Sequence, residues 1–331
     1  MTSTVTQRNK ETVWDLWQSL PGTPADGLAD VLRRYVREDI AWHGPHPIND
    51  LAGVDALAAG FWHPLLRSFP DARRETDVFL GGPFEGREWV AGTGYFVGTF
   101  AEDWLSIPAS GAPTAIRFGE FCRLEDGRIA EVYIILDIIG VMLQAGQRVL
   151  PPSPGDESKV PGPSDGRGVL LAPQNDAAGA ESRRLVEAMI AGLGRFDRQN
   201  LASMDMADFW SRDMQWYGPI GIGTAHGLAD YEQVHAGPFL HAFPDRKGGH
   251  HKARLAEGDY VASTGWPSVY ATHTGDYLGQ PATGKAIGMR VMDFWRREGD
   301  LLVQNWVFID LIDLFRQFGV DLFERLGERV A

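Results

Sequence analysis

The sequence predicts an α+β fold that occurs in two tandem copies. Three observations carry this prediction: an internal repeat, a proline- and glycine-rich segment between its two copies, and one order of helical and strand patterns in both. The chain has 331 residues, which corresponds to about two domains of ordinary size. We therefore expect two similar domains, each with its own core.

The internal repeat is visible in motifs that recur in the same order. Residues 39–45 (DIAWHGP) match residues 213–219 (DMQWYGP), which is a shift of 174 positions (213 − 39). An FPD triplet at 69–71 recurs at 243–245 with the same shift. Later matches need only small, loop-sized changes in this shift. The pattern indicates a duplicated domain.

A segment rich in proline, glycine, serine and aspartate separates the two copies. It covers residues 149–178, between a first domain of residues 1–148 and a second domain of residues 179–331. Such a composition buries too little apolar surface to offset the entropy lost on ordering. We expect a linker that lies outside both cores.

Helical periodicity opens each copy. Apolar residues at positions 28, 31, 32, 35 and 36 follow the spacing of one helix face, and positions 185–193 show the same pattern in the second copy. A further helix is expected over residues 55–68, because the residue before Pro70 disfavours the helical conformation.

Strand patterns follow the helices, over residues 89–100, 116–124 and 129–139. Asp126 and Gly127 lie between the last two runs and predict a hairpin turn. A short amphipathic helix over residues 314–323 closes the second copy. Helices followed by an antiparallel meander make an α+β unit.

Composition excludes several classes of partner and site. The 44 Asp and Glu residues outnumber the 31 Lys and Arg residues, and the net charge of −13 would repel a phosphate backbone, so we expect no nucleic-acid partner. Cys122 is the single cysteine, which excludes an internal disulfide and multi-cysteine zinc sites. The polar N-terminus lacks the apolar core of a signal peptide, and no apolar run reaches the ~18 residues of a membrane span. We expect a soluble, cytoplasmic protein that does not bind membranes.

Motifs in the second copy carry a resemblance to a known family. They are WYGP at 216–219, AFPD at 242–245, THTGDY at 272–277, PATGK at 281–285, MR at 289–290, NWVFID at 305–310 and QFG at 317–319. In this order they resemble the SnoaL-like polyketide cyclases of the nuclear transport factor two superfamily. The resemblance implies that each copy is a cone, in which a curved antiparallel sheet wraps around helices and encloses an apolar pocket that usually needs no cofactor. We expect the two cones to pack as an internal pseudo-dimer, and we leave a further homo-oligomer open.

Asp310 and Asp137 are the first candidates for a catalytic acid/base. Each interrupts an otherwise apolar strand, and alternation places Asp310 on one face with Trp306 and Phe308. A carboxyl among such neighbours is poorly solvated, which raises its pKa and suits a general base. The resemblance also implies that an aspartate of this last strand is the acid/base. The alternative is structural: each Asp caps a turn or pairs with an arginine.

Arg290 and Arg117 occupy matching positions on the preceding strand. Each could hold a substrate carbonyl or stabilise an enolate, or it could pair with the Asp of its own copy. His273 is a candidate donor or second acid/base, because histidine titrates near pH ~6.5; a solvent-facing edge position is the alternative. Its counterpart in the first copy is Phe100, so we expect the second copy to carry most of the chemistry.

His43 and His46 have a spacing that can bind a metal, but no third ligand is evident in the sequence. We therefore expect no metal and no other cofactor, and we keep His43 as a hydrogen-bonding residue of the pocket. Further candidates for contacting the substrate, mostly aromatic and at matched or motif positions, are Trp42, Arg117, Trp216, Tyr217, Tyr277 and Trp306. Simple core packing is the alternative for the aromatic residues.

The function that these patterns favour is cofactor-independent acid/base chemistry on a hydrophobic, carbonyl-containing small molecule. Asp310 would remove a proton next to the carbonyl, while His273 or Arg290 stabilises the oxyanion, in a cyclase, isomerase or lyase reaction. Two alternatives stay open at this point. One is a hydrolase with an Asp-activated water, and the other is a binding module without turnover. Unpaired aspartates facing a cavity would favour catalysis, whereas pairing with arginines would favour a scaffold.

Overall fold

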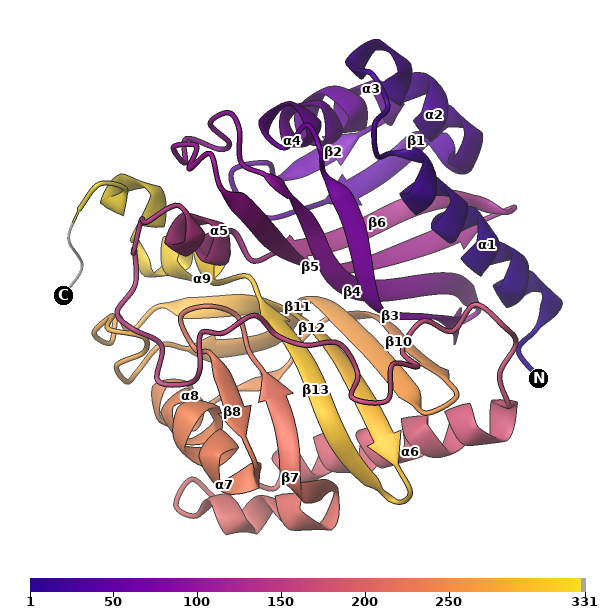
Figure 1. The fold of residues 1–331 in the computed structure, drawn as a ribbon. Coiled ribbons are helices and arrows are strands. Elements are labelled where there is room, and N and C mark those ends of the chain that lie inside the picture. Colours follow the sequence, from indigo (N-terminus) through magenta and orange to yellow (C-terminus); the bar gives the residue numbers. More distant parts are fainter. Residues whose placement is uncertain (329–331) are drawn as a thin grey trace.

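The computed structural model describes residues 1–328 and contains two α+β domains (Figure 1). The first domain contains α1 (Thr4–Ser19), α2 (Leu28–Tyr35), β1 (Val36–His43), β2 (Asp50–Ala52), α3 (Val54–Leu57), α4 (His63–Ser68), β3 (Arg73–Phe84), β4 (Arg87–Thr99), β5 (Pro113–Glu125), β6 (Arg128–Leu136) and α5 (Ile138–Gln144). The second contains α6 (Asp176–Leu193), β7 (Trp210–Tyr217), β8 (Thr224–His226), α7 (Leu228–Tyr231), α8 (Gly237–Ala242), β9 (Lys247–Gly248), β10 (His251–Glu257), β11 (Tyr260–Thr272), β12 (Ala286–Glu298), β13 (Leu301–Ile309) and α9 (Leu311–Phe318).

The two domains share one sheet topology. The first sheet has the order β2-β1-β6-β5-β4-β3, and the second has the matching order β8-β7-β13-β12-β11-β10 with β9 paired to β11. In each sheet one pair is parallel, β1 with β6 and β7 with β13, and the other pairs are antiparallel. Helix α1 packs against β3 and β4, and α6 packs against β10 and β11. The expected α+β duplication is confirmed.

Most of the expected elements are present. The helix expected over 28–36 is α2, and the segment 55–68 forms α3, a π-helical turn over Ala58–Trp62, and α4. The three expected strands are β4, β5 and β6, but β6 ends at Leu136 rather than at 139. The chain turns there because the side chain of Asp137 accepts a hydrogen bond from the Gly140 amide and caps α5.

The outer faces of the two sheets pack against each other, which confirms the expected pseudo-dimer. Phe121 of β5 and Phe294 of β12 meet across the interface with ring centroids 5.5 Å apart. A Cβ atom at Gly119 would lie 2.9 Å from the Phe308 ring, so this close approach requires a glycine. Strand alternation produces this surface, because Trp306 and Phe308 point to the interface and the alternate residues Val307 and Ile309 point into the cone.

The segment between the domains differs from the expectation. It has no regular helix or strand over residues 145–175, yet Val149, Leu150, Val160 and Leu170 are buried. Its expected place outside both cores is therefore wrong. Val160 and Leu170 join the apolar cluster between the two sheets, Val149 and Leu150 join the larger core cluster, and overall composition does not reveal such spacing. The domain boundaries at 148 and 178 stay predictions.

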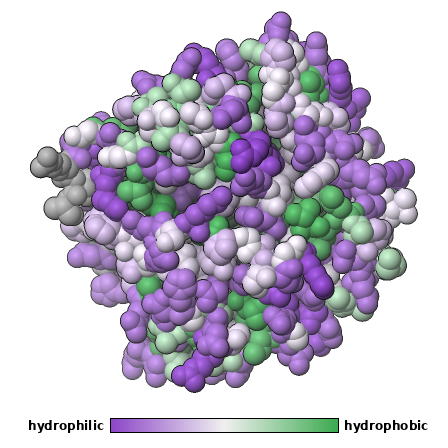
Figure 2. Space-filling view, viewed as in Figure 1, coloured by the Kyte–Doolittle hydropathy of each residue, from purple (hydrophilic) through white to green (hydrophobic). Residues whose placement is uncertain are grey.

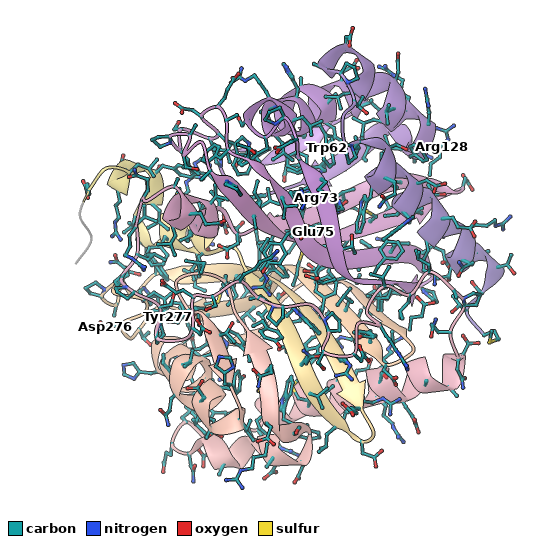
Figure 3. The ribbon with its side chains drawn as sticks, viewed as in Figure 1. Trp62, Arg73, Glu75, Arg128, Asp276 and Tyr277 are labelled. Atoms are coloured by element: carbon teal, nitrogen blue, oxygen red, sulfur yellow. The ribbon has the colours of Figure 1, made fainter. Side chains whose placement is uncertain are left out.

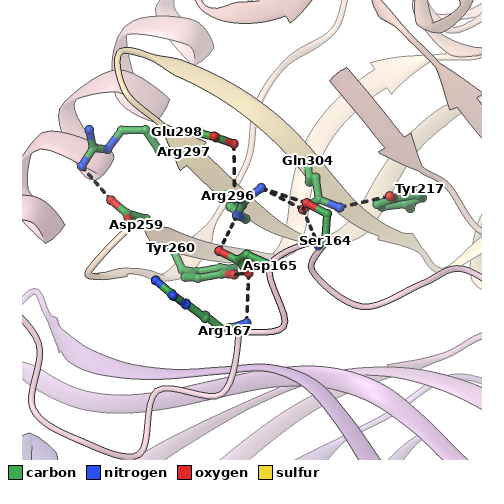
Figure 4. A network of polar contacts seen from close by, with 10 residues as sticks. All are labelled: Ser164, Asp165, Arg167, Tyr217, Asp259, Tyr260, Arg296, Arg297, Glu298 and Gln304. Atoms are coloured by element: carbon green, nitrogen blue, oxygen red, sulfur yellow. Dashed lines mark hydrogen bonds and ion pairs between the residues drawn. The ribbon is translucent and has the colours of Figure 1, made fainter. Parts of the chain in front are cut away.

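Polar contacts also attach this segment to the second sheet (Figure 4). Asp165 accepts a hydrogen bond from Arg296 Nε at 3.2 Å, and the Ser164 amide donates to Gln304 Oε1 at 3.2 Å. Gln304 Nε2 in turn donates to the Tyr217 hydroxyl at 3.1 Å. The Trp306 indole donates to the carbonyl oxygen of residue 161 at 2.9 Å. These contacts make the segment part of the interface.

The surface is mostly hydrophilic, with separate apolar patches (Figure 2). The large apolar side chains that are clearly exposed among residues 1–328 are Met1, Val5 and Leu171. No helix in the same part of the chain combines the length and the hydropathy that a transmembrane helix needs.

A buried ion pair joins the two domains. Lys10 of α1 lies 2.7 Å from Glu257 of β10, and their side chains are 0% and 3% exposed. Lys10 Nζ also donates to the Leu170 carbonyl at 2.6 Å, and Glu257 accepts a hydrogen bond from the Gly81 amide at 2.9 Å. The pair therefore links the first domain, the connecting segment and the second domain.

We expect Lys10→Met to lower the free energy of unfolding by about 3–5 kcal/mol, because Glu257 would keep a buried charge without its cation. Adding Glu257→Gln should recover most of this loss, since glutamine removes the charge and keeps an acceptor for the Gly81 amide. Urea denaturation at pH 7 measures both variants. A double variant no more stable than Lys10→Met would show that the charge is not the cause.

Candidate functional site

The second domain encloses a cavity of about 490 Å³ between α6, the helical segment 228–242 and strands β11–β13. We call it the second-domain cavity. Aromatic side chains form much of its wall: Trp210, Trp216, Tyr231, Phe239 and Trp295. Polar side chains also line it: Ser263, Ser268, His235, Asp293 and Asn305. An apolar pocket with a few polar groups is typical of a small-molecule site.

Strand alternation brings the polar groups into this cavity. Asn305, Val307 and Ile309 of β13 point inward, and Asp293 of β12 lies opposite Val307 in the sheet register. Asn305 Nδ2 donates to Asp293 Oδ1 at 3.3 Å. The carboxyl and the amide therefore form a polar pair on an otherwise apolar wall.

Asp293 is held in a form that can take or give a proton near neutral pH. Burial raises the pKa of its carboxyl to about 7, against opposing effects of the Asn305 hydrogen bond and the charge of Arg254. Within residues 1–328, no arginine or lysine lies within ion-pair distance of it. A carboxyl with a pKa near 7 that faces a cavity is suited to general acid/base catalysis.

His235 and Trp295 supply polar atoms without protein partners. The His235 ring stacks between Trp216 and Phe239, with centroid distances of 4.3 and 5.3 Å. Burial lowers its pKa to about 3, so the imidazole is neutral at pH 7. His235 Nδ1 and Trp295 Nε1 are buried and have no hydrogen-bond partner in the described part of the chain. A ligand in the cavity could satisfy both.

The first domain fills the corresponding space with its own side chains. Glu120 has the register position of Asp293, since it faces Gly92 and Ile134 as Asp293 faces Ser263 and Val307. It accepts hydrogen bonds from Arg74 Nη1 at 2.8 Å and from Trp17 Nε1 at 3.2 Å. The Arg74 guanidinium also lies 3.9 Å from the centroid of the Trp17 ring. Only about 10 Å³ of space is left beside this cluster.

A single glycine explains much of the difference. Arg74 pairs with Phe96 in the first sheet, and Gly248 pairs with the matching Val269 in the second. Gly248 therefore occupies the position of Arg74, and no other atom of residues 1–328 lies within 4 Å of where its Cβ would be. Without that side chain the space stays open, and no arginine or lysine of the described chain lies within ion-pair distance of Asp293.

Comparisons with known proteins agree with this architecture. The family model of the SnoaL-like polyketide cyclases matches residues 14–145 and again residues 185–318. The chain belongs to this family. The double match confirms both the resemblance and the two tandem copies.

Solved structures that match parts of this chain include a SnoaL-like protein from Jannaschia sp. CCS1. Its identity is 24%, the match covers 43% of this chain and 94% of that chain, and the TM-score is 0.37. IdmH from Streptomyces antibioticus has 21% identity, coverage of 42% and 98%, and a TM-score of 0.35. AclR from Streptomyces galilaeus has 29% identity, coverage of 43% and 97%, and a TM-score of 0.35. No curated protein matches the chain.

The two aspartates singled out in the sequence lie outside the second-domain cavity. Asp310 caps α9 by accepting from the Asp313 amide at 3.0 Å, and it pairs with Arg290 at 3.2 Å. Asp137 caps α5 and also accepts from the Ile220 amide of the other domain at 3.0 Å. Burial raises the pKa of both carboxyls, that of Asp310 to about 6. Their contacts favour the structural alternative, and a catalytic role stays a prediction.

The two arginines differ in their surroundings. Arg290 also lies 3.6 Å from Asp313, and its guanidinium is 4.5 Å from the Trp266 ring. Arg117 is buried at the domain interface, where it donates to the carbonyl oxygens of Gly218 and Tyr217 at 2.8 and 3.0 Å. Neither lines the second-domain cavity.

His273 and Tyr277 are buried beside this cavity rather than on its wall. His273 stacks on Phe318 at 3.9 Å, its Nδ1 lies 3.1 Å from Thr283 Oγ1, and burial lowers its pKa. Tyr277 follows β11 (Figure 3). Its ring packs on Phe243 with ring centroids 5.1 Å apart. The structure thus groups them in one aromatic cluster, apart from Asp293.

Two of the first-domain candidates, Arg117 and Asp137, line a separate cavity of about 220 Å³ between the domains, whereas His43 and His46 do not line it. His43 stacks on Tyr133 at 4.5 Å, and its contact with Glu131 raises its pKa. His46 Nδ1 lies 2.9 Å from Arg316 Nη1, and a cation next to this nitrogen does not favour a metal ion there. No group of three metal-ligating side chains is found between residues 1 and 328. The absence of a metal from the function stays a prediction.

Of the aromatic candidates, Trp216 lines the second-domain cavity. Tyr217 and Trp306 belong to the domain interface, where their rings lie 5.5 Å apart. Trp42 is a core residue of the first domain, packed on Phe61 at 4.8 Å. The contacts of Tyr217, Trp306 and Trp42 are therefore those of core packing.

Sequence reasoning missed Asp293 and His235. Asp293 carries the same signal as Asp310, a carboxyl within the apolar run VMDFW. The repeat offered a second signal, because Glu120 matches it at the shift of 173 (293 − 120). Both faces of each strand are apolar, so the sequence did not show which face points into the cone. Without that information Asp293 could not be preferred to Asp310.

We expect Asp293→Asn to stabilise the protein increasingly as the pH rises. The carboxyl has a pKa of about 7 when folded against 3.8 unfolded, so the folded state holds more protons and loses stability between pH 4 and 7. Asparagine removes this loss, at most about 1.4 kcal/mol per pH unit. Thermal melts at pH 5 and pH 8 measure the effect, with exposed Asp213→Asn as control. Parallel curves for wild type and variant would contradict the raised pKa.

We expect Gly248→Arg to close the second-domain cavity in the way that Arg74 closes the first. The new guanidinium should pair with Asp293, because the space at Gly248 is open. Binding of 2-naphthol, measured by isothermal titration calorimetry, should weaken about tenfold or more, since the arginine fills the site and removes apolar surface. Gly248→Ala is the matched control and should bind as wild type does. Equal binding by the arginine variant would place the ligand elsewhere.

Proposed function

We propose that the second-domain cavity is the active site of a cofactor-independent acid/base enzyme that acts on a hydrophobic, carbonyl-containing small molecule. The family to which the chain belongs supports a reaction of the cyclase or isomerase type. The observation that carries the proposal is Asp293: a carboxyl without a paired cation, with a pKa of about 7, on the wall of an aromatic cavity.

In the proposed reaction, the Asp293 carboxylate removes a proton from the carbon next to the substrate carbonyl. The C–H bond breaks, the proton moves to Asp293, and the electron pair forms an enolate. In one outcome the enolate carbon attacks a second carbonyl of the same molecule, and the alkoxide that forms takes the proton from Asp293. In the other, the enolate is conjugated with a double bond, and Asp293 returns the proton to a different carbon of the dienolate. The first outcome is cyclisation and the second is isomerisation. Neither route needs an oxidant or a reductant.

Two donors are placed to stabilise the enolate oxygen. The Trp295 indole N–H is buried on the cavity wall and has no partner among residues 1–328. His235 is neutral, and in the tautomer with a proton on Nδ1 it supplies a second donor. Donors that are already desolvated and fixed by packing stabilise a developing oxyanion without reorganisation.

The aromatic wall supports the same proposal. Trp216 holds the His235 ring by stacking at 4.3 Å, and Tyr231 lies beside both. Flat faces of this kind accept a planar substrate and exclude water, which would otherwise protonate the enolate. The first domain lacks an equivalent space, so one active site per chain is proposed.

We expect Asp293→Asn to reduce catalysis of α-proton exchange far more than Asp310→Asn does. The probe is 2-tetralone, whose exchange with D₂O is followed by proton NMR. Loss of a positioned general base removes roughly 10²–10⁴-fold in rate. The wild-type rate should rise with pH and level off above the pKa of Asp293, because only the ionised carboxyl accepts a proton. The residual rate of Asp293→Asn should lack this step.

The same assay decides between the two aspartates. A larger loss from Asp310→Asn would return the catalytic role to the residue favoured by sequence. Wild-type exchange no faster than in buffer, together with measurable 2-tetralone binding, would favour the non-catalytic binding module.

A further inference from the structure

The mouth of the second-domain cavity carries positive charge on an acidic protein. Three basic residues line this part of the cavity beside one carboxylate, Asp245: Arg198 in the loop after α6, Arg246 just before β9, and Lys247 of β9. We call these three basic residues the basic rim. The chain as a whole has a net charge of −13. A local cluster of the opposite sign therefore attracts anions that the rest of the surface repels.

Arg246 is the central residue of the basic rim. Its Nη2 donates to the Leu193 carbonyl at 2.8 Å, and its guanidinium lies 5.5 Å from the Phe196 ring. In the part of the chain that the structure describes, no carboxylate lies within 4.0 Å of it. Burial lowers its pKa, which means that its charge is partly desolvated without being paired. An unpaired, partly desolvated guanidinium gains from binding an anion.

The nearest acidic groups do not supply this anion. Asp245 precedes Arg246, but its two oxygens accept hydrogen bonds from the Thr272 amide and hydroxyl at 2.8 and 2.7 Å. Asp293 lies on the β-sheet wall and bonds Asn305. The guanidinium nitrogens that do not bond Leu193 are left for a ligand.

The side chains at the matching positions of the first domain have different surroundings. Ala72 and Arg73 stand where the second domain has Arg246 and Lys247, at the shift of 174 (246 − 72). Arg73 is exposed and pairs with Glu75 at 2.9 Å (Figure 3). A half-buried guanidinium without an acidic partner at this point is therefore a property of the domain that has the cavity.

We propose that the basic rim is a carboxylate-binding subsite, so that the second-domain cavity takes a flat, apolar ligand whose one acidic group stays at the mouth. A planar carboxylate matches the fork of a guanidinium. The inner end of the cavity contains Asp293, whose negative charge disfavours a second anion, so the acidic end of the ligand faces outward. The proposed function adds that the inner end of this ligand carries the reacting carbonyl, and this part of the inference rests on it. The binding of the carboxylate at the basic rim is independent of the proposed function.

Isothermal titration calorimetry with 2-naphthoate and the neutral isostere 2-naphthamide tests this subsite. The wild type should bind the acid about tenfold more tightly than the amide at low ionic strength, because charge-assisted hydrogen bonds are stronger than neutral ones. The preference should shrink at 0.5 M NaCl. Arg246→Met should abolish it, and Arg246→Lys should restore part of it. Arg87→Met, an exposed change of charge in the first domain, is the matched control and should leave it unchanged.

A purely structural role of Arg246, as a cap of α6, would weaken both ligands equally and would overturn the proposal. Equal affinity of the wild type for acid and amide, or binding of neither, would also overturn it. Repeating the titrations with Asp293→Asn separates the two proposals. That variant should keep or strengthen the preference for the acid even if 2-tetralone exchange shows that Asp293 is not the base.

Discussion

Both faces of each sheet are apolar, so each domain buries one face around its own helices and the other against its twin. Phe121, Phe294 and Phe308 are part of the layer between the sheets. The connecting segment and the Lys10–Glu257 pair close the edges of this layer. Because Trp306 and Phe308 must face the twin domain, the alternate residues of β13 must face the cone. The polar lining of the second-domain cavity follows from this requirement.

The two copies show how one fold becomes either a filled core or a pocket. In the first, Arg74 neutralises Glu120 and, together with Trp17, fills the cone. In the second, Gly248 leaves the matching carboxyl of Asp293 unpaired. A buried ion pair is of limited value for stability, whereas an unpaired buried carboxyl destabilises the fold at neutral pH. The unpaired carboxyl of Asp293 lowers the stability of the fold, and a role in catalysis or binding would explain why it is present.

The charge distribution of the second domain extends this contrast. Where the first domain places its cation inside the cone, the second has Arg246 at the mouth, half-buried and without an acidic partner among the described residues. An acid inside and a cation outside orient a ligand along the cavity. The buried nitrogens of Trp295 and His235 belong to residues that line the same cavity as the acid. A ligand bound in this orientation would be anchored by Arg246 at the mouth and would react beside Asp293.

The sequence by itself determined the duplication, the α+β class and most helices and strands, because periodicity and repeated motifs are local properties of the chain. It also indicated that the second copy differs, through His273 against Phe100. Only the tertiary structure decided which strand face points inward, since Asp293 and Asp310 both interrupt apolar runs, yet Asp293 lies within β12 on the cavity wall and Asp310 follows β13 and caps α9. It alone decided that the proline-rich segment is packed, because a few apolar side chains fit a crevice that two sheets create. The burial of a side chain and its pairing with a charge depend on neighbours that are distant in sequence, so no local sequence pattern predicts them.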